Sequence, residues 1–550
     1  MSQPYTHLLS DEQVQLFITD GMIELQSELS DEFHATVTAE LDHALKKEMR
    51  WLGDNLVPRI PLLQEFLDSP VLNGALKSIL GPDFSWAPHR FPHNSEPLPE
   101  DVELGEIDAF ENQPVMGKGS ISGSGWHQDG HSKGARSRWH TFRAINVFYF
   151  PHDTPIEMGP TRVLAGSHLY ATLNHIVPEQ VVFKPRKAGS FIVAAFDLGH
   201  AGTPNQTRQS RYMLKFVALR MKNPSEPVWN HVNDEWRTPP DRLTTDNLPT
   251  TWLSLWNWIC GKSRQENIST PSSKAIREDL PRLASKNHLE RLEAMYRLSA
   301  STQEDIPLLV DYFLGCAGKG RHESPPPEDR GYYAMAKDPL LRQFTKRQFV
   351  PEDLAIVLGA VGLPALDVLV ELLTHEDPWI RMNAAYAISE IGCEVPSEIA
   401  DRVGMLLDEP LDCVVRAALD ALCSLNNYTE VTVTRLHRLL TESPDDWQYA
   451  AMGEKKLGGN WTIQNQVRYV AAWALRTRVI GSSVPDGIEQ ALIDALEENT
   501  GYTPAVACEA LEILNTPAGL RAVIKYLSTR RWDPSSFAPI PRRQVALKVA

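Results

Sequence analysis

A chain of 550 residues exceeds what a single hydrophobic core usually supports, so we expect two or more domains. Its apolar fraction of 42% and charged fraction of 23% are those of an ordinary globular protein. The formal charge of −16 argues against a general binder of nucleic acid or anionic membranes, because contacts to phosphate need a basic surface.

The six cysteines are scattered and form no Cys-x-x-Cys pair, which indicates reduced thiols in a reducing compartment. Residues 1–7 lack the basic segment and apolar core of a signal peptide, and no apolar run approaches membrane-spanning length. We therefore expect a cytoplasmic location.

Residues 10–50 have a helical pattern, in which Ser10 and Ser30 are placed to begin successive helices as N-caps. Residues 51–125 are rich in proline and glycine, and they predict short strands and loops that wall a substrate pocket. We interpret His89 and His93 within them as surface or packing residues.

Short runs of β-branched and aromatic residues follow, separated by turn signals. They span residues 142–150, 181–183, 191–196 and 212–217. Several short strands without long intervening helices predict a double-stranded β-helix, or jelly roll, with flanking helices. Such a fold can bring residues that are far apart in the sequence to one site.

Three side chains in this region form a candidate metal site. In an extended segment His127 and Asp129 point to the same side, because successive side chains alternate between the two faces. With His200 they supply two imidazoles and one carboxylate, the facial triad of non-haem Fe(II) oxygenases. A His-x-Asp pair alone means little, since residues 375–377 have the same spacing between two helical patterns, where we predict a loop and a helix cap.

Arg211 heads the last of these strands and is placed at the mouth of the same barrel. A planar guanidinium there can hold the distal carboxylate of a 2-oxo diacid through two parallel hydrogen bonds. Arg208 competes for this role, but its position in the preceding turn suits solvent better.

This region resembles the phytanoyl-CoA dioxygenase (PhyH) family of Fe(II)/2-oxoglutarate oxygenases. The resemblance rests on residues 126–129, 158–168 and 200–205 with Arg211, and it extends upstream to residues 9–17, 20 and 21. It implies that His127, Asp129 and His200 are the catalytic iron ligands, that Arg211 anchors 2-oxoglutarate, and that O₂ is consumed. Ala165 departs from the proline usual in the family, which affects a turn and leaves the ligands intact.

Five further residues were weighed for the site. We expect Asn146 to face inward and hydrogen-bond the cosubstrate, with an outward polar position as the open alternative. Thr161 and Ser167 are expected either to contact the cosubstrate or substrate, or to stabilise turns. His140, like His131, is interpreted as a lining or lid residue rather than a ligand.

The chain changes character after residue 220. Residues 226–280 contain prolines and three closely spaced tryptophans, and we interpret them as a junction and linker that packs on the barrel. The predicted domains are therefore a PhyH-like jelly roll over residues 1–225, this junction, and a helical repeat domain over residues 281–550.

The repeat prediction rests on similar segments at residues 380–388, 414–422 and 467–475, with fainter copies at 292–298 and 507–514. Asp377 and Asp412 are placed to cap the second helix of a pair. These segments resemble HEAT-type repeats, which stack helix pairs into a solenoid. We expect the solenoid of this chain to bind a partner protein, to buttress the barrel or to dimerise it.

Three functions remain open from the sequence. The first is a dioxygenase that hydroxylates a small-molecule or lipid-derived substrate, or a residue of another protein; Asp129 favours hydroxylation over halogenation because it fills the position that a halide would need. The second is a catalytically inactive interaction scaffold. The third is a zinc hydrolase with the same ligands, which Arg211 and the lack of a placed general base disfavour.

Overall fold

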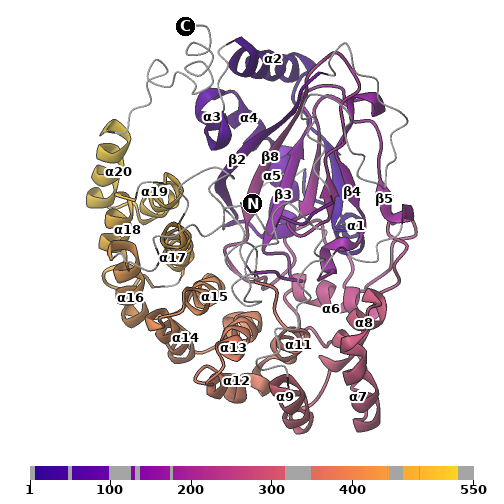
Figure 1. Ribbon diagram of the computed structural model, residues 1–550, viewed down its shortest axis with the longest axis vertical. Helices are drawn as coiled ribbons and strands as arrows, with labels where there is room; N and C mark the ends of the chain where they lie inside the picture. Colours follow the sequence, from indigo (N-terminus) through magenta and orange to yellow (C-terminus); the bar gives the residue numbers. More distant parts are fainter. Residues whose placement is uncertain are drawn as a thin grey trace, which may run out of the picture.

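The computed structural model describes residues 7–47, 52–97, 126–129, 137–171, 173, 178–315, 349–442, 444, 447, 462–481, 483–498 and 500–529. It has an N-terminal region of β-sheet with flanking helices and a C-terminal region that is entirely helical (Figure 1). His131 and residues 98–125 of the predicted pocket wall lie outside the described residues.

Two helices open the chain at the predicted positions. α1 (Asp11–Asp20) begins with a capping box on Ser10, and α2 (Asp31–Asp42) begins at Ser30, whose hydroxyl accepts a hydrogen bond from the Phe33 amide. The predicted helical pattern is wrong between them, where β1 (Met22–Gln26) pairs with a strand far along the chain. Main-chain pairing to a sheet edge overrides local propensity there.

The larger sheet has five strands, and each pair of neighbours is antiparallel. In spatial order they are β1, β6 (Ser190–Ala195), β3 (Ala144–Tyr149), β8 (Arg211–Leu219) and β2 (Ser85–Ser95). The predicted runs at 142–150, 191–196 and 212–217 are therefore strands of one sheet.

The smaller sheet has three short antiparallel strands, in the order β5 (Val181–Val182), β4 (Arg162–Leu164) and β7 (His200–Ala201). Apolar side chains from both sheets meet in one cluster formed by Met22, Phe148, Phe150, Val163, Ile192, Ala194, Leu198 and Met213. We call these residues the inter-sheet cluster, and the candidate site lies beside it. The jelly-roll strand connections stay a prediction.

Helices cover the sheets and join them to the C-terminal region. Those near the sheets are α3 (Leu56–Arg59), α4 (Leu63–Leu67), α5 (Pro70–Leu80) and α6 (Pro249–Ile259), and those that follow are α7 (Ser273–Asp279), α8 (His288–Leu298) and α9 (Ile306–Leu314). The three tryptophans predicted to pack, Trp252, Trp256 and Trp258, lie on α6 and are buried.

The C-terminal helices form two layers (Figure 1). The inner layer, stacked helix on helix beside the sheets, consists of α11 (Asp353–Val361), α13 (Pro378–Ile391), α15 (Asp412–Leu422), α17 (Ile463–Val479) and α19 (Tyr502–Leu514). The outer layer consists of α12 (Leu366–Leu372), α14 (Ser397–Met405), α16 (Glu430–Thr441), α18 (Ile488–Ala495) and α20 (Pro517–Thr529). The similar segments at 380–388, 414–422, 467–475 and 507–514 fall on the inner helices α13, α15, α17 and α19, where their alanines let stacked helices approach closely, whereas the faint copy at 292–298 falls on α8.

The two predicted helix caps differ in outcome. Asp377 is the N-cap of α13, and its carboxylate accepts a hydrogen bond from the Trp379 amide at 2.8 Å. The prediction for Asp412 is wrong, because Leu411 is the N-cap of α15 and Asp412 is the first residue of the helix. One turn later Arg416 lies on the same face, with its Nη1 4.0 Å from the Asp412 carboxylate.

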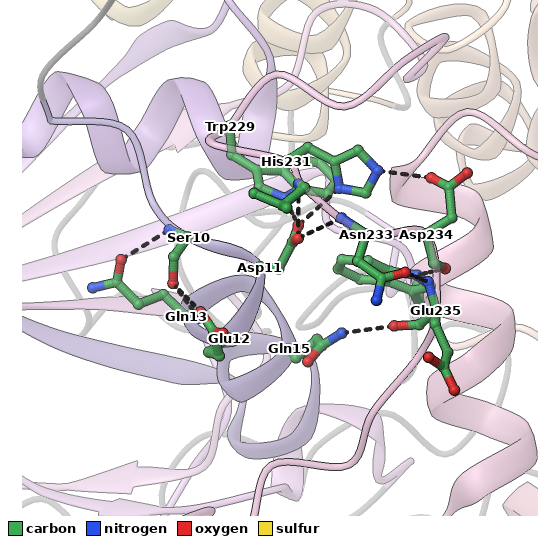
Figure 2. Close-up of polar contacts among 12 residues, drawn as sticks. Ser10, Asp11, Glu12, Gln13, Gln15, Trp229, His231, Asn233, Asp234 and Glu235 are labelled. Carbon is green, nitrogen blue, oxygen red and sulfur yellow. Dashed lines mark hydrogen bonds and ion pairs between the residues drawn. The ribbon is translucent and has the colours of Figure 1, made fainter.

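A polar cluster ties the start of α1 to the segment after β8 (Figure 2). Asp11 accepts hydrogen bonds from Trp229 Nε1 at 2.7 Å and from the amides of Val232 and Asn233 at 2.9 Å. His231 lies between two carboxylates, with Nδ1 2.8 Å from Asp11 and Nε2 2.7 Å from Asp234. Since both partners only accept, the imidazolium form satisfies this arrangement.

This cluster predicts a pH-dependent contribution to stability. Burial lowers the pKa of His231, but the hydrogen bonds to Asp234 and Asp11 outweigh it and the pKa is raised above 6.5. A raised histidine pKa stabilises the fold fully below pH 6.5, and this stabilisation is lost as the pH rises through the folded-state pKa. We expect His231→Asn to lower the unfolding temperature by ~1–3 °C near pH 6 and by less near pH 8.5, measured by thermal unfolding. An equal loss at both pH values would contradict the prediction.

No single helix of the described chain has both the length and the apolar composition of a membrane span. The helices at residues 353–361 and 363–372 reach them only as a pair, across a bend of 115°.

Candidate metal centre

His127, Asp129 and His200 come together at the edge of the smaller sheet. One donor atom from each lies within 4.8 Å of the other two, and they are the only group of three or more such side chains found among the described residues. The backbones of His127 and His200 form an antiparallel bridge, with N–H to O distances of 3.1 and 3.0 Å. This pairing puts the two rings side by side, with centroids 4.3 Å apart.

His200 is held as a neutral imidazole. Its Nδ1 lies 2.9 Å from the Leu198 carbonyl oxygen, which can only accept, so the proton is on Nδ1 and the lone pair is on Nε2. Nε2 faces Asp129, 3.8 Å from Oδ1. Burial, together with the neighbouring His127, lowers the pKa of His200 to about 3. The ring can therefore bind a cation without first losing a proton at neutral pH.

Asp129 is buried, and its second oxygen is held by two donors. Oδ2 accepts hydrogen bonds from Asn146 Nδ2 at 2.7 Å and from Lys215 Nζ at 2.5 Å. Oδ1 is thereby left facing His200. Partners of this kind fix the orientation of a metal-binding carboxylate and usually matter for affinity nearly as much as the ligand itself.

Asn146 faces inward and is buried, and its Nδ2 donates to Asp129 Oδ2 at 2.7 Å and to the Phe196 carbonyl at 3.2 Å. Its contact with a cosubstrate stays a prediction. We expect Asn146→Ala to weaken divalent-metal binding by about 10–100-fold, because the carboxylate loses a donor that fixes its direction. Metal titration of the purified variant measures this. Asn383→Ala is the matched control: Asn383 is an equally buried asparagine on α13 that bonds Glu352 and Trp379, and its loss should lower stability while metal affinity stays unchanged.

Arg211 is the first residue of β8 and is 4% exposed. It lies two positions before Met213 of the inter-sheet cluster and four before Lys215, so strand alternation directs all three toward the space between the sheets. Arg211 Nε has no hydrogen-bond partner among the described residues. Burial lowers the pKa of Arg211 to about 10, which leaves it a cation at neutral pH. Arg208 is exposed in the turn before it.

The remaining candidates are Thr161, Ser167 and His140, and their surroundings differ. Thr161, just before β4, is buried, and its hydroxyl has no hydrogen-bond partner among the described residues. Ser167 has the alternative role, because its hydroxyl donates to the Leu164 carbonyl and accepts from the Gly199 amide and so fixes a turn. His140 is not a member of the donor group, and its Nδ1 lies 3.0 Å from the Tyr296 hydroxyl on α8.

One residue of the site, Lys215, had no predicted role. Lys215 was within a predicted strand, and counting two and four positions on from Arg211 would have placed it on the inner face. His93, predicted to be a surface or packing residue, pairs with Met213 across β2 and β8 and is exposed. His89 instead lies 3.0 Å from Asp54 and 3.2 Å from the Tyr502 hydroxyl, a packing role as predicted.

The sequence was compared with known families and proteins. Residues 9–213 match the family described as phytanoyl-CoA dioxygenase (PhyH), and residues 350–423 match HEAT repeats. No curated protein matches the chain.

Solved structures that are similar to part of the chain include a non-haem monooxygenase and two proteins solved with 2-oxoglutarate (alpha ketoglutarate). The non-haem monooxygenase ThoJ in its apo form is 18% identical over 41% of this chain and 84% of its own, with a TM-score of 0.29. The epimerase SnoN, in complex with Fe3+, alpha ketoglutarate and nogalamycin RO, is 16% identical over 38% and 84%, with a TM-score of 0.30. EctD from S. alaskensis, with 2-oxoglutarate and 5-hydroxyectoine, is 15% identical over 40% and 79%, with a TM-score of 0.31.

The family match covers both histidines and the aspartate of the donor group as well as Arg211. Residues 9–213 are a domain of the phytanoyl-CoA dioxygenase (PhyH) family, and it is followed by HEAT repeats at residues 350–423.

Proposed function

We propose that this protein is an Fe(II)- and 2-oxoglutarate-dependent dioxygenase that hydroxylates a small-molecule or lipid-derived substrate. The observation that carries the proposal is the donor group of two imidazoles and one carboxylate within 4.8 Å, formed beside the inter-sheet cluster. Such a set occupies one face of Fe(II) and leaves the other positions for a chelating cosubstrate and O₂.

The residues present fit both groups. His127, Asp129 and His200 would hold the iron, and the neutral Nε2 of His200 carries the lone pair that would bind it. Arg211 is a buried cation whose Nε lacks a partner among the described residues, as expected of a group that binds the distal carboxylate of 2-oxoglutarate. The buried hydroxyl of Thr161 also lacks a hydrogen-bond partner among the described residues, and a bound cosubstrate could supply one.

Bound Fe(II) and 2-oxoglutarate would activate O₂ for insertion of one oxygen atom into a C–H bond. The protein supplies position and surroundings. Asn146 and Lys215 keep Asp129 turned toward His200, and the apolar side chains of the inter-sheet cluster exclude water beside the donors. The retained carboxylate of Asp129 favours hydroxylation over halogenation.

An inactive scaffold is the alternative function. A domain that had lost its chemistry would be expected to lose at least one of His127, Asp129, His200 and Arg211, and all four are present and buried or partly buried. We place the oxygenase in residues 1–225, the junction in 226–280 and the repeats in 281–550. Since the inner helices of the repeats contact the sheet region, a partner protein would meet the outer layer, which includes α16, α18 and α20.

The test is to add Fe(II) and then 2-oxoglutarate to the metal-free protein without oxygen and to record visible absorbance. We expect the charge-transfer band of a chelated 2-oxo acid in the native protein and its loss in His200→Ala. His375→Ala removes the histidine of the second His-x-Asp motif, in the turn before α13, and should leave the band unchanged. Native protein that binds neither iron nor 2-oxoglutarate would overturn the proposal and favour the scaffold.

A further inference from the structure

The chain that follows the metal donors is bonded to the helical repeats. Ser137 donates its amide and its hydroxyl to Asp420 Oδ2 on α15, at 2.6 and 2.8 Å. The amide of Arg138 donates to the Phe349 carbonyl, just ahead of α11, at 2.7 Å. Both Ser137 and Asp420 are 3% exposed, so these bonds form in a protected interior where an unpaired group is costly.

Arg138 leads from this anchor back to the donors. Its Nη2 donates to Gln128 Oε1 at 2.7 Å, and its Nη1 donates to the Tyr170 carbonyl at 2.9 Å. Gln128 Nε2 donates to that same carbonyl at 3.0 Å. Since Gln128 stands between His127 and Asp129 in the chain, holding its side chain restrains the backbone that carries both of them.

A second route runs through Glu390 on α13, whose side chain is fully buried. Its carboxylate accepts from Thr141 Oγ1 at 3.1 Å, from Arg143 Nη2 at 3.1 Å and from Arg264 Nη1 at 3.0 Å. Arg143 directly precedes β3, the strand that carries Asn146 to Asp129. The repeats thus hold the start of the strand that orients the carboxylate ligand.

We infer that the helical repeats position the metal centre, with Asp420 and Glu390 as positioning residues for the donor segment and for β3. The inference rests on the proposed function, because it takes the donor group as an Fe(II) site. Its consequence is that metal affinity depends on residues of the repeat region that contact neither metal nor cosubstrate. A repeat region that only buttressed the barrel would change stability and leave affinity unaltered.

The chain offers a matched control for this distinction. Glu509 on α19 also joins the repeats to the sheet region, because its carboxylate accepts from the Ser85 hydroxyl of β2 at 2.6 Å and from Arg476 at 2.7 Å. Ser85 pairs with Leu219, at the far end of β8 from Arg211. Glu509→Gln therefore weakens a contact of the same kind away from the donor segment.

The experiment uses the full chain with Asp420→Asn, Glu390→Gln, Ser137→Ala and Glu509→Gln. Fe(II) and 2-oxoglutarate are titrated without oxygen below the unfolding temperature, and amide hydrogen exchange at residues 126–129 is followed in the metal-free protein. We expect the first three variants to bind Fe(II) about 10-fold or more weakly and to exchange the His127 amide faster, and Glu509→Gln to do neither. If Glu390→Gln does not fold, Asp420→Asn and Ser137→Ala decide the outcome, because both variants leave Arg143 and Arg264 paired with Glu390.

Each outcome points one way. Unaltered iron affinity and exchange in Asp420→Asn and Ser137→Ala, with native protein that binds iron, overturn the inference and leave the proposed function standing. If Glu509→Gln loses as much Fe(II) affinity and speeds His127 amide exchange as much as the other variants, the inference is also overturned, because any weakened contact between the repeats and the sheets would then have the same effect. Native protein that binds no iron overturns the proposed function, and hydrogen exchange still decides whether the repeats anchor the donor segment.

Discussion

Asp129→Ala is expected to lower Fe(II) affinity by more than ~100-fold and to abolish the charge-transfer band with 2-oxoglutarate. Two neutral imidazoles would remain without an anionic ligand for a divalent ion. The substitution also leaves the buried ammonium of Lys215 without the carboxylate that it contacts at 2.5 Å, and that unpaired cation repels the metal. Metal titration and anaerobic absorbance measure the two effects.

Asp377→Ala is the matched control, because Asp377 has the same place in the second His-x-Asp motif. It caps α13, so its loss should cost about 1 kcal/mol of folding free energy and leave iron binding unaltered. The double variant Asp129→Ala with Lys215→Met should recover part of the affinity, since the unpaired cation is removed. Iron binding by Asp129→Ala at native affinity would show that the carboxylate is not a ligand.

Arg211→Leu is expected to weaken 2-oxoglutarate binding by ~100-fold or more and to leave Fe(II) affinity within a few-fold of native. Two hydrogen bonds from a buried guanidinium to a carboxylate are worth about 3 kcal/mol or more, and leucine offers neither. Arg211→Lys should retain part of the binding, because an ammonium keeps the charge but not the two parallel bonds. The dependence of the charge-transfer band on 2-oxoglutarate concentration gives these affinities.

Arg208→Leu is the control for charge alone, because Arg208 is exposed in the adjacent turn and should have little effect. A large loss in Arg208→Leu together with native-like binding in Arg211→Leu would reverse the two assignments. Loss of iron binding in Arg211→Leu would instead point to a structural role for this arginine in the sheet.

The sequence by itself determined the features that depend on neighbours along the chain. Alternation in an extended segment put His127 and Asp129 on one side, and hydroxyls at Ser10 and Ser30 marked two helix starts that the structure confirms. The alanine-rich repeats predicted the inner helices α13, α15 and α17. These signals are legible because side-chain direction and capping are set within a few residues.

Only the tertiary structure decided what depends on contacts between distant residues. β1 is a strand because it pairs with β6. Asn146 donates a hydrogen bond to Asp129 because the fold brings their two segments together. The bonds from Ser137 to Asp420 and from Arg143 to Glu390 cross 283 and 247 positions, and nothing local marks them. A buried polar group must find a partner, but the fold decides which one comes within hydrogen-bond distance. The repeats' part in holding the metal donors was therefore beyond the reach of the sequence alone.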